Sequence, residues 1–165
     1  MLGFVMAGGK SSRMGTEKPL LEFKGKKFVD ISCEAVIKSG LKCIVAVSHN
    51  APNTMDYVRN KYETMITPGI DYCVDVKFIF DKIKEPFLTV VSDLPFISFL
   101  DIKEFMKDYK GKSMAGVIIK NGKIEYIGIN IVSDDINDDI HIFKNDLLSI
   151  NVNTWDDYKK ILEKV

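Results

Sequence analysis

The most constraining feature of this sequence is an alternation of short apolar runs and helical segments through its first 91 residues. The apolar runs are rich in β-branched residues and predict strands over 2–6, 42–48, 64–67 and 87–91. The segments between them place apolar residues at helical spacing and predict helices over 28–39, 53–63 and 71–84. Strands that alternate with helices in this way form a parallel sheet with helices on both faces.

The second half of the chain carries a different pattern. Asp101, with Glu104 three residues later, predicts the N-cap of a helix that ends at Gly111. Asn121-Gly122 is a strong hairpin signal, because both positions of such a turn favour residues that adopt positive φ. The hairpin joins two predicted strands, which cover 113–119 and 123–132.

The last third of the chain is more polar. Residues 133–140 predict an acidic loop that contains Asp134, Asp135, Asp138 and Asp139 and lacks the glycine and glutamate of a calcium loop. A last strand is predicted at 147–152, and Thr154 with Asp157 predicts the cap of a final helix. The sequence therefore predicts a single α/β domain over 1–165, with a three-layer α/β/α architecture and a mainly parallel, mixed central sheet.

Composition excludes several classes of protein. The 23 basic and 23 acidic residues balance, which argues against a nucleic-acid-binding or membrane-surface protein. Three cysteines without C-x-x-C spacing predict reduced thiols rather than a disulfide framework or a zinc site. No apolar run approaches the roughly 20 residues that span a bilayer, and "MLGFVM" is too short for a signal peptide. We therefore expect a cytoplasmic protein.

A ligand of an open α/β sheet binds at the carboxyl ends of its strands. In this sequence the segments that follow the predicted strands are rich in glycine and small polar residues and include one carboxylate. They contribute Ala7, Gly8, Gly9, Ser48, Thr67, Gly69, Asp93 and Asn153. This composition is typical of a nucleotide-phosphate site.

The stretch "MAGGKSSRMGTEKPLLEFKGK", from Met6 to Lys26, carries the strongest signal. It is not a P-loop, because Phe4 stands where that motif requires its first glycine, and Gly15 and Pro19 interrupt the helix that should follow. Instead, Gly8 and Gly9 would let backbone N–H groups approach an anion.

The cations and oxygen donors around this stretch fit a phosphate ligand. Arg13 offers a planar fork for two phosphate oxygens, Lys18 offers a point charge, and Lys10 is either a phosphate contact or a solvated loop residue. Asp93 suits Mg²⁺, although it is also placed to cap a helix. Asn153 is either a metal ligand or a helix cap, with Thr154 as its competitor for the cap.

This stretch resembles the N-terminal signature of the MobA-like nucleotidyltransferases, [LM]-A-G-G-x-S-x-R-M-G-x-x-K-x-L-L-x-x-x-G-K, and fills every fixed position. "TVVSDLPF" and "INVNTWDDYKK" resemble the family's metal-binding segments, which implies Asp93 and Asn153 as ligands of Mg²⁺. The implied fold is the Rossmann-like nucleotidyltransferase fold. Within the family, "VSHNAPNT", "TPGIDYCVD", "GINIVS" and "NVNTWDDYKKILEK" are similar to the archaeal-type GTP:adenosylcobinamide-phosphate guanylyltransferases.

The resemblance implies transfer of GMP from GTP to a phosphorylated acceptor, a corrinoid, with Arg13, Lys18 and Asp93 as catalytic residues. The nucleotide contacts it implies are Ala7, Gly8, Gly9, Lys10, Arg13, Gly15, Lys18, Ser48, Thr67, Gly69 and Asp93. Gly128 and Asn130 are the residues we expect at the acceptor, and the hairpin offers an edge through which a homodimer could form.

Two alternatives to this function remain open from the sequence. One is another nucleotidyltransferase of the same fold, which acts on a molybdenum cofactor or a sugar phosphate. Thr67-Pro68-Gly69 weakens the molybdenum reading, since those enzymes usually carry G-P-L-x-G at this place. The other alternative is a nucleotide-binding module without catalysis.

Overall fold

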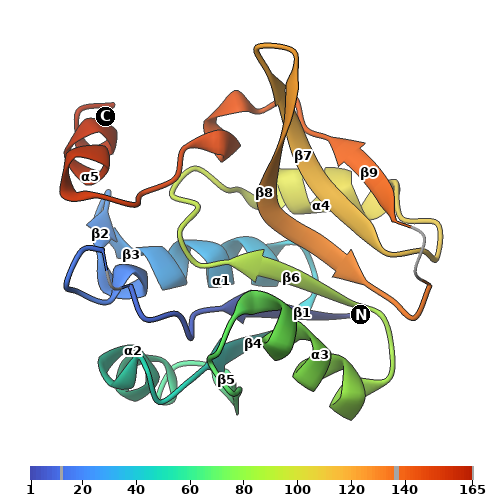
Figure 1. The fold of residues 1–165 in the computed structure, drawn as a ribbon, viewed down its shortest axis with the longest axis horizontal. Coiled ribbons are helices and arrows are strands. Elements are labelled where there is room, and N and C mark those ends of the chain that lie inside the picture. The colour runs from blue at the N-terminus through green and yellow to red at the C-terminus, as the bar shows by residue number, and fades with distance from the viewer. Residues whose placement is uncertain (12, 136–137, 165) are drawn as a thin grey trace.

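The computed structural model describes residues 1–11, 13–135 and 138–164. Its centre is a seven-stranded sheet in the order β5-β4-β1-β6-β8-β7-β9 (Figure 1). Four strands are parallel to one another: β1 (Leu2–Met6), β4 (Lys42–Val47), β5 (Glu63–Ile66) and β6 (Phe87–Val91). Their carboxyl ends meet at one edge of the sheet, which is where a ligand site is expected.

The hairpin after residue 113 turns the sheet into a mixed one. Strand β8 (Lys123–Val132) pairs antiparallel with β6 and with β7 (Met114–Lys120), and β9 (Asp139–Ile142) adds to β7 in parallel. Asn121 and Gly122 both have positive φ, at 52° and 72°, as the turn between β7 and β8 requires. The predicted mainly parallel, mixed sheet is therefore confirmed.

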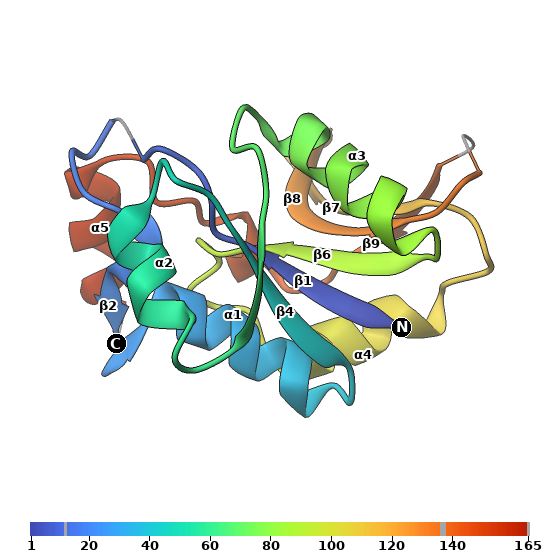
Figure 2. The ribbon, with the colours of Figure 1, turned by 90° about the horizontal axis from the view of Figure 1, so that it is seen from below.

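Helices cover the sheet from both sides, which confirms the three layers (Figure 2). Helices α1 (Phe28–Lys38) and α4 (Phe99–Lys107) lie on one face, and α3 (Tyr72–Ile83) lies on the other. The larger core is formed under α1 and α4 and includes Val5, Val36, Val90 and Phe105, all fully buried. A smaller core under α3 is built around Phe4, Ile79 and Phe87.

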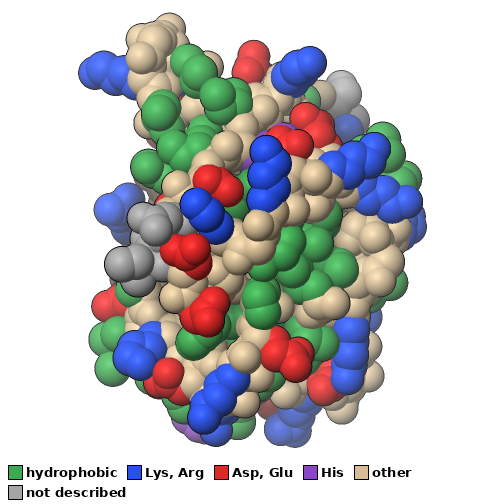
Figure 3. All heavy atoms as spheres, turned by 90° about the vertical axis from the view of Figure 1, so that its right-hand side faces the viewer, with side chains coloured by type: hydrophobic (Ala, Val, Ile, Leu, Met, Phe, Trp, Pro, Cys, Tyr) green, Lys and Arg blue, Asp and Glu red, His purple; other side chains and the backbone are tan. Residues whose placement is uncertain are grey.

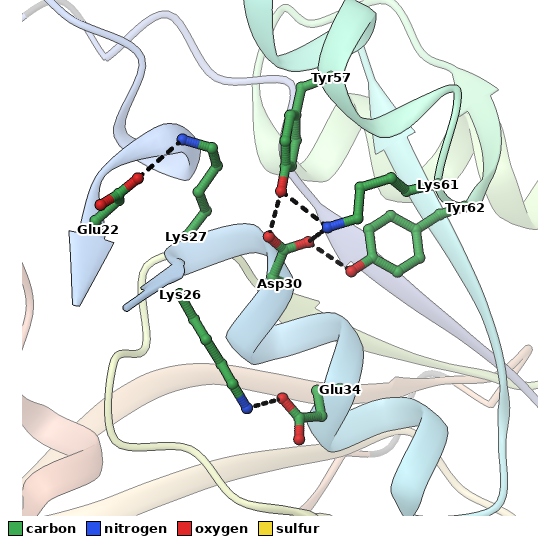
Figure 4. Close-up of polar contacts among 8 residues, drawn as sticks. All are labelled: Glu22, Lys26, Lys27, Asp30, Glu34, Tyr57, Lys61 and Tyr62. Atoms are coloured by element: carbon green, nitrogen blue, oxygen red, sulfur yellow. Dashed lines mark hydrogen bonds and ion pairs between the residues drawn. The ribbon is translucent and has the colours of Figure 1, made fainter. Parts of the chain in front are cut away.

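A carboxylate joins α1 to α2 (Pro52–Val58) and the residues after it (Figure 4). Asp30 accepts hydrogen bonds from the hydroxyls of Tyr57, at 2.6 Å, and Tyr62, at 2.5 Å, and from Lys61 Nζ at 3.1 Å. Burial of Asp30 opposes its ionisation, but these donors outweigh it and lower the pKa of the carboxyl. The cluster therefore fixes how the first two helices of the chain pack together.

Three predicted helix ends are wrong: α4 ends at Lys107 rather than at Gly111, and the other two errors concern the end of α2 and the start of α4. Helix α2 ends at Val58 rather than at residue 63, because the chain turns at 59–62 to enter β5. Asp101 is not the N-cap of α4: Ser98 holds that position, and Asp101 is its partner in a capping box three residues later. The caps predicted for the final helix are confirmed, since Thr154 and Asp157 form a capping box at α5 (Trp155–Leu162).

Three strand assignments also differ from the prediction. Residues 147–152 form no strand: a 3-10 helix covers Asp146–Ser149, and Leu148 and Val152 are buried by tertiary packing. Part of the predicted acidic loop is strand β9, and residues 136 and 137 of that loop lie outside the described residues. A short hairpin of β2 (Glu22–Phe23) and β3 (Lys26–Lys27) was not predicted.

The cysteines of the described residues are free, with Cys33 and Cys43 buried and Cys73 exposed. Within those same residues, every helix is too short or too polar to cross a membrane.

Candidate active site

The loop after β1 is anchored to β4 and to the loop that follows β4. The N–H of Ala7 extends the β1–β4 ladder by donating to Ala46 at 2.9 Å, and the carbonyl of Gly8 accepts from Ser48 Oγ at 2.5 Å. A Cβ on Gly8 would lie 3.2 Å from the Cβ of Ser48, so glycine lets the two loops approach closely. Beyond Gly8, Gly9 and Lys10 are exposed.

A cavity of about 460 Å³ opens at the carboxyl ends of β1 and β6. Four of the residues predicted for phosphate and metal chemistry line it: Arg13, Lys18, Asp93 and Asn153. Gly9 forms part of its wall, and the remaining lining residues are Met6, Ser11, Met14, Pro19, Val91 and Ser92. The structure thus brings together two cations, one carboxylate and one amide from three distant parts of the sequence.

Lys18 and Asp93 form an ion pair within this cavity. Lys18 Nζ lies 3.1 Å from Asp93 Oδ2, and each side chain is about a fifth exposed, at 21% and 22%. Ser11 supports this arrangement by accepting the backbone N–H of Lys18 at 3.0 Å. Arg13 is exposed, and its guanidinium forms no ion pair with the described residues. The cavity therefore contains Lys18, which is held by an ion pair, and Arg13, whose guanidinium is available to bind a ligand.

The capping of α5 excludes one of the two roles predicted for Asn153. Thr154 Oγ1 accepts from the N–H of Asp157, so the cap of α5 is Thr154 and not Asn153. The amide of Asn153 lines the cavity instead.

The donor set of the cavity fits a magnesium ion that arrives with a phosphate substrate. Asp93 and Asn153 carry hard oxygen donors at the cavity, and no cluster of three or more His, Cys, Asp or Glu suited to a metal occurs in the described chain. Mg²⁺ is usually held by one or two protein oxygens and completes its octahedron with water and substrate phosphate. The residues present are therefore sufficient for Mg²⁺ and too few for a metal held by protein ligands alone.

Ser48, Thr67 and Gly69 do not line this cavity; they form the framework behind the glycine loop. Ser48 and Thr67 are buried, and Thr67 donates its hydroxyl to Val47 O at 3.2 Å. Gly69 has a φ of +72°, donates its N–H to Asp75 and accepts from the Asn50 amide. A Cβ on Gly69 would lie 2.5 Å from Ser48 Oγ, so only glycine fits between these loops.

Lys10 and Gly15 line a second, smaller hollow on the other side of the loop, of about 330 Å³, together with Thr16, Glu17, Leu20 and Asn53. Glu17 fixes this side of the loop to the start of α2. Its carboxylate accepts from Thr54 N at 2.8 Å and from Asn53 Nδ2 at 2.6 Å. Partial burial opposes ionisation of Glu17, but these hydrogen bonds lower its pKa. Sequence reasoning missed this residue.

The C-terminal helix holds the loop from the opposite side. Trp155 Nε1 donates to the carbonyl of Met14 at 3.1 Å, and the Met14 side chain is buried among Phe23, Phe28 and Val152. Met14 is the neighbour of Arg13, so α5 positions the loop that carries the free cation. Nothing in the sequence indicated this partner of Trp155.

The two residues predicted at the acceptor lie on β8, next to the cavity. Gly128 has a φ of +80°, and a Cβ there would lie 2.6 Å from Val91 Cγ2. Asn130 donates from Nδ2 to the hydroxyl of Tyr72 at 2.8 Å. Gly128 lies in an irregular stretch of β8, between the pairs that Tyr126 forms with Val117 and Asn130 forms with Ala115.

The fold, the glycine loop and the cavity define a nucleotidyltransferase, and the chain belongs to the MobA-like NTP transferase family, whose domain matches residues 3–131. It is 33% identical to the adenosylcobinamide-phosphate guanylyltransferase of Methanocaldococcus jannaschii, over 96% of this chain and 94% of that protein. A probable molybdenum cofactor guanylyltransferase of Natranaerobius thermophilus is 36% identical over 61 residues, which are 37% of this chain and 29% of that protein.

Solved structures agree on the fold. Rv0371c from Mycobacterium tuberculosis superposes with a TM-score of 0.79 at 14% identity, over 100% of this chain and 99% of that one. A nucleotidyl transferase from Methanothermobacter thermautotroptrophicus gives a TM-score of 0.73 at 15% identity, over 98% and 95% of the two chains. The predicted Rossmann-like nucleotidyltransferase fold is thereby confirmed.

Proposed function

We propose that this protein transfers GMP from GTP to the phosphate of adenosylcobinamide phosphate and releases pyrophosphate, with Mg²⁺ as cofactor. The observation that carries the chemistry is the single cavity that Arg13, Lys18, Asp93 and Asn153 line beside Gly9. The identity of the acceptor is supported by the M. jannaschii relative, which matches nearly the whole chain.

The reaction is a displacement at the α-phosphorus of GTP. An oxygen of the acceptor's phosphate forms a bond to that phosphorus, the bond to the bridging oxygen of the β-phosphate breaks, and pyrophosphate leaves with that electron pair. The attacking phosphate is already an anion at neutral pH, so no general base is needed. The main obstacle is repulsion between two anions, and the protein lowers it by fixed charge and by positioning.

Each charged residue has a distinct part in this proposal. Arg13 is exposed at the cavity and binds the β- and γ-phosphates, where it stabilises the leaving pyrophosphate. Lys18 lies near the α-phosphate and the incoming phosphate. Asp93 and Asn153 would hold Mg²⁺, which supplies positive charge to the phosphate oxygens when it is bound. Because Lys18 contacts Asp93 in the structure, the lysine and a bound Mg²⁺ would share one carboxylate.

The nucleoside of GTP is expected at the glycine loop. The edge of the guanine and ribose is assigned to Ala7, Gly8, Thr67 and Gly69. Ser48 would act from behind the loop, since its buried hydroxyl is bonded to Gly8. Lys10 and Gly15 would contact phosphate only if the triphosphate extends to their side of the loop.

Calorimetric titration with GTP, ATP, CTP and UTP, each with Mg²⁺, tests the donor. Binding of GTP alone is expected. Transfer from radiolabelled GTP to adenosylcobinamide phosphate then tests the acceptor, with a molybdopterin and a sugar 1-phosphate as the alternative acceptors. Preference for CTP or UTP, or transfer only to an alternative acceptor, would refute the proposed reaction. Either result would still agree with nucleotidyl transfer by this fold. Nucleotide binding without transfer to any acceptor would favour the non-catalytic alternative.

A further inference from the structure

One face of the hairpin region carries large apolar side chains that no helix covers. We call it the hairpin face and define it by Ile119, Ile124, Tyr126, Ile140 and Ile142. These side chains are 48–68% exposed, and Tyr126 is the most exposed of them. In Figure 3, where the hairpin is the uppermost part of the molecule, hydrophobic side chains gather just below its tip.

Strand register places all five on the same side of the sheet. Ile119 pairs with Ile124, and Val117 pairs with Tyr126 on β8 and with Ile142 on β9. Ala115, two residues before Val117, pairs with Ile140. Side chains in register lie on one face, so the five residues form one surface.

The opposite face of these strands belongs to the core. His141 and Phe143 project there, and their rings pack against each other and against Phe105 of α4. Five large exposed apolar side chains on one face are more than scattered surface residues, and such groups usually mark a binding surface.

The strand that carries part of the hairpin face also reaches the active-site cavity. Val91 lines that cavity, and Gly128 lies against Val91, where a Cβ would be 2.6 Å from its side chain. Tyr126 and Asn130 lie on either side of Gly128 along β8, pair with Val117 and Ala115 on one face of β7, and with Tyr72 line a hollow of about 300 Å³. A molecule whose phosphate lies in the cavity could therefore pass over Gly128 and rest its other end on Tyr126.

The inner end of this surface carries polar groups fixed by hydrogen bonds. Tyr72 Oη lies 2.7 Å from Thr89 Oγ1 and accepts from Asn130 Nδ2 at 2.8 Å. Asn130 Oδ1 accepts no hydrogen bond from the described residues, so it remains available to a ligand donor. The surface thus joins an apolar outer part to an oriented amide near the cavity.

We propose that the hairpin face binds the non-phosphate part of the acceptor, and that it selects a phosphorylated molecule with a large apolar, partly planar body packed on Tyr126. The proposal rests on the proposed function for the position of the reacting phosphate. We assign this face to the acceptor rather than to a second copy of the chain, because Gly128 of β8 lies against Val91, which lines the cavity. A small polar acceptor would leave Tyr126 and the isoleucines in water.

Equilibrium dialysis with adenosylcobinamide phosphate as the probe tests this directly. The protein is saturated with Mg²⁺ and α,β-methylene-GTP, which cannot transfer GMP, so that an ordered binding sequence does not hide the probe. Tyr126→Ala should weaken probe binding by about ten-fold, as expected for loss of a packed aromatic ring. The matched control is Leu100→Ala, which removes a side chain that is 63% exposed on α4, on the opposite face. It should leave probe binding unchanged, and neither variant should change the affinity for GTP.

The outcomes separate this inference from the proposed function. Equal probe binding by Tyr126→Ala and wild type overturns the inference, even if GMP transfer occurs. Weakened binding without any GMP transfer supports the face as a binding surface and refutes the proposed reaction. No binding of the probe to wild type overturns the inference. The inference is also overturned if sedimentation analysis finds a dimer and Tyr126→Ala dissociates it. The hairpin face would then bind a second copy of the chain.

Discussion

Arg13 and Lys18 carry the same charge, but the protein holds them differently. Lys18 is paired with Asp93, and its backbone is fixed by Ser11. Arg13 is exposed and forms no ion pair within the described chain. A side chain without structural partners can be removed at little cost in stability, so the effect of its loss on catalysis can be measured cleanly.

Arg13→Ala should therefore lower turnover by about 10²–10³, the usual effect of removing a group that stabilises developing charge. Its thermal midpoint should stay within a degree or so of wild type, since surface substitutions seldom exceed roughly 0.5 kcal/mol. Arg13→Lys keeps the charge and loses the fork, so it should recover part of the activity. Steady-state kinetics and thermal unfolding check both variants. Wild-type turnover in Arg13→Ala would contradict the role assigned to this residue.

Asp93→Asn removes the charge that Lys18 and Mg²⁺ are proposed to share while it keeps the size of the side chain. Activity should fall by at least 10², and the concentration of Mg²⁺ needed for half-maximal activity should rise. Stability should change by less than about 1 kcal/mol, because the ion pair is partly exposed. A magnesium titration of activity measures the loss of activity and the Mg²⁺ requirement, and urea unfolding measures the change in stability. An unchanged magnesium requirement would exclude Asp93 as a ligand.

At the scale of elements, α5 contacts the active-site loop through a hydrogen bond from Trp155 to Met14 as well as through apolar packing. Trp155→Phe keeps an aromatic ring beside Tyr158 and removes the donor to Met14. We expect stability to fall by about 1 kcal/mol and kcat to fall several-fold, since the loop that carries Arg13 loses its anchor. Tyr158→Phe is the matched control, because it loses a hydrogen bond to Glu22 that does not involve Met14. Equal kcat values in wild type and Trp155→Phe would reduce Trp155 to a structural role.

Elements with a strong local pattern could be predicted from the sequence. The strands β1 and β6 and the helix α1 match their predicted ranges to within a residue, because their apolar spacing and flanking glycine or proline are local signals. Segments decided by tertiary contact could not be predicted. Residues 147–152 look like a strand, yet they form a 3-10 helix and an irregular stretch that bury Leu148 and Val152.

The same distinction applies to the site. Arg13 and Lys18 lie within one continuous motif, and Asp93 ends a buried strand, so the sequence identified all three. The bond from Trp155 to Met14 joins residues 141 positions apart and involves a backbone carbonyl, for which no residue type is diagnostic. Glu17, which contacts the start of α2, is a similar case, since its partners are mostly backbone N–H groups.

At the scale of the whole molecule, the cavity is assembled from residues 6–19, 91–93 and 153, so it exists only when both halves of the chain are folded. The cluster around Asp30 contributes to that fold by joining α1 to α2 and the residues after it. Its energetic contribution depends on a carboxylate, which makes it sensitive to acid.

The direction of this pH dependence follows from the pKa of Asp30. Although burial raises that pKa, hydrogen bonds from Tyr57, Tyr62 and Lys61 hold it below its ordinary value of 3.8. A carboxyl whose pKa is lower in the folded state stabilises the protein above its unfolded pKa. That stability is lost as pH falls through the folded pKa.

Asp30→Asn should therefore lower the free energy of unfolding at neutral pH by about 1–3 kcal/mol, the range for hydrogen bonds to a charged group. The difference between variant and wild type should narrow as pH falls below about 4, where protonation removes the same charge from wild type. Glu17, Glu34 and Asp157 also have lowered pKa values, but both proteins contain them, so the comparison isolates Asp30. Urea unfolding of the two proteins between neutral pH and about pH 3 measures the difference. If the two curves of stability against pH stay parallel, ionised Asp30 does not stabilise the packing of α1 against α2.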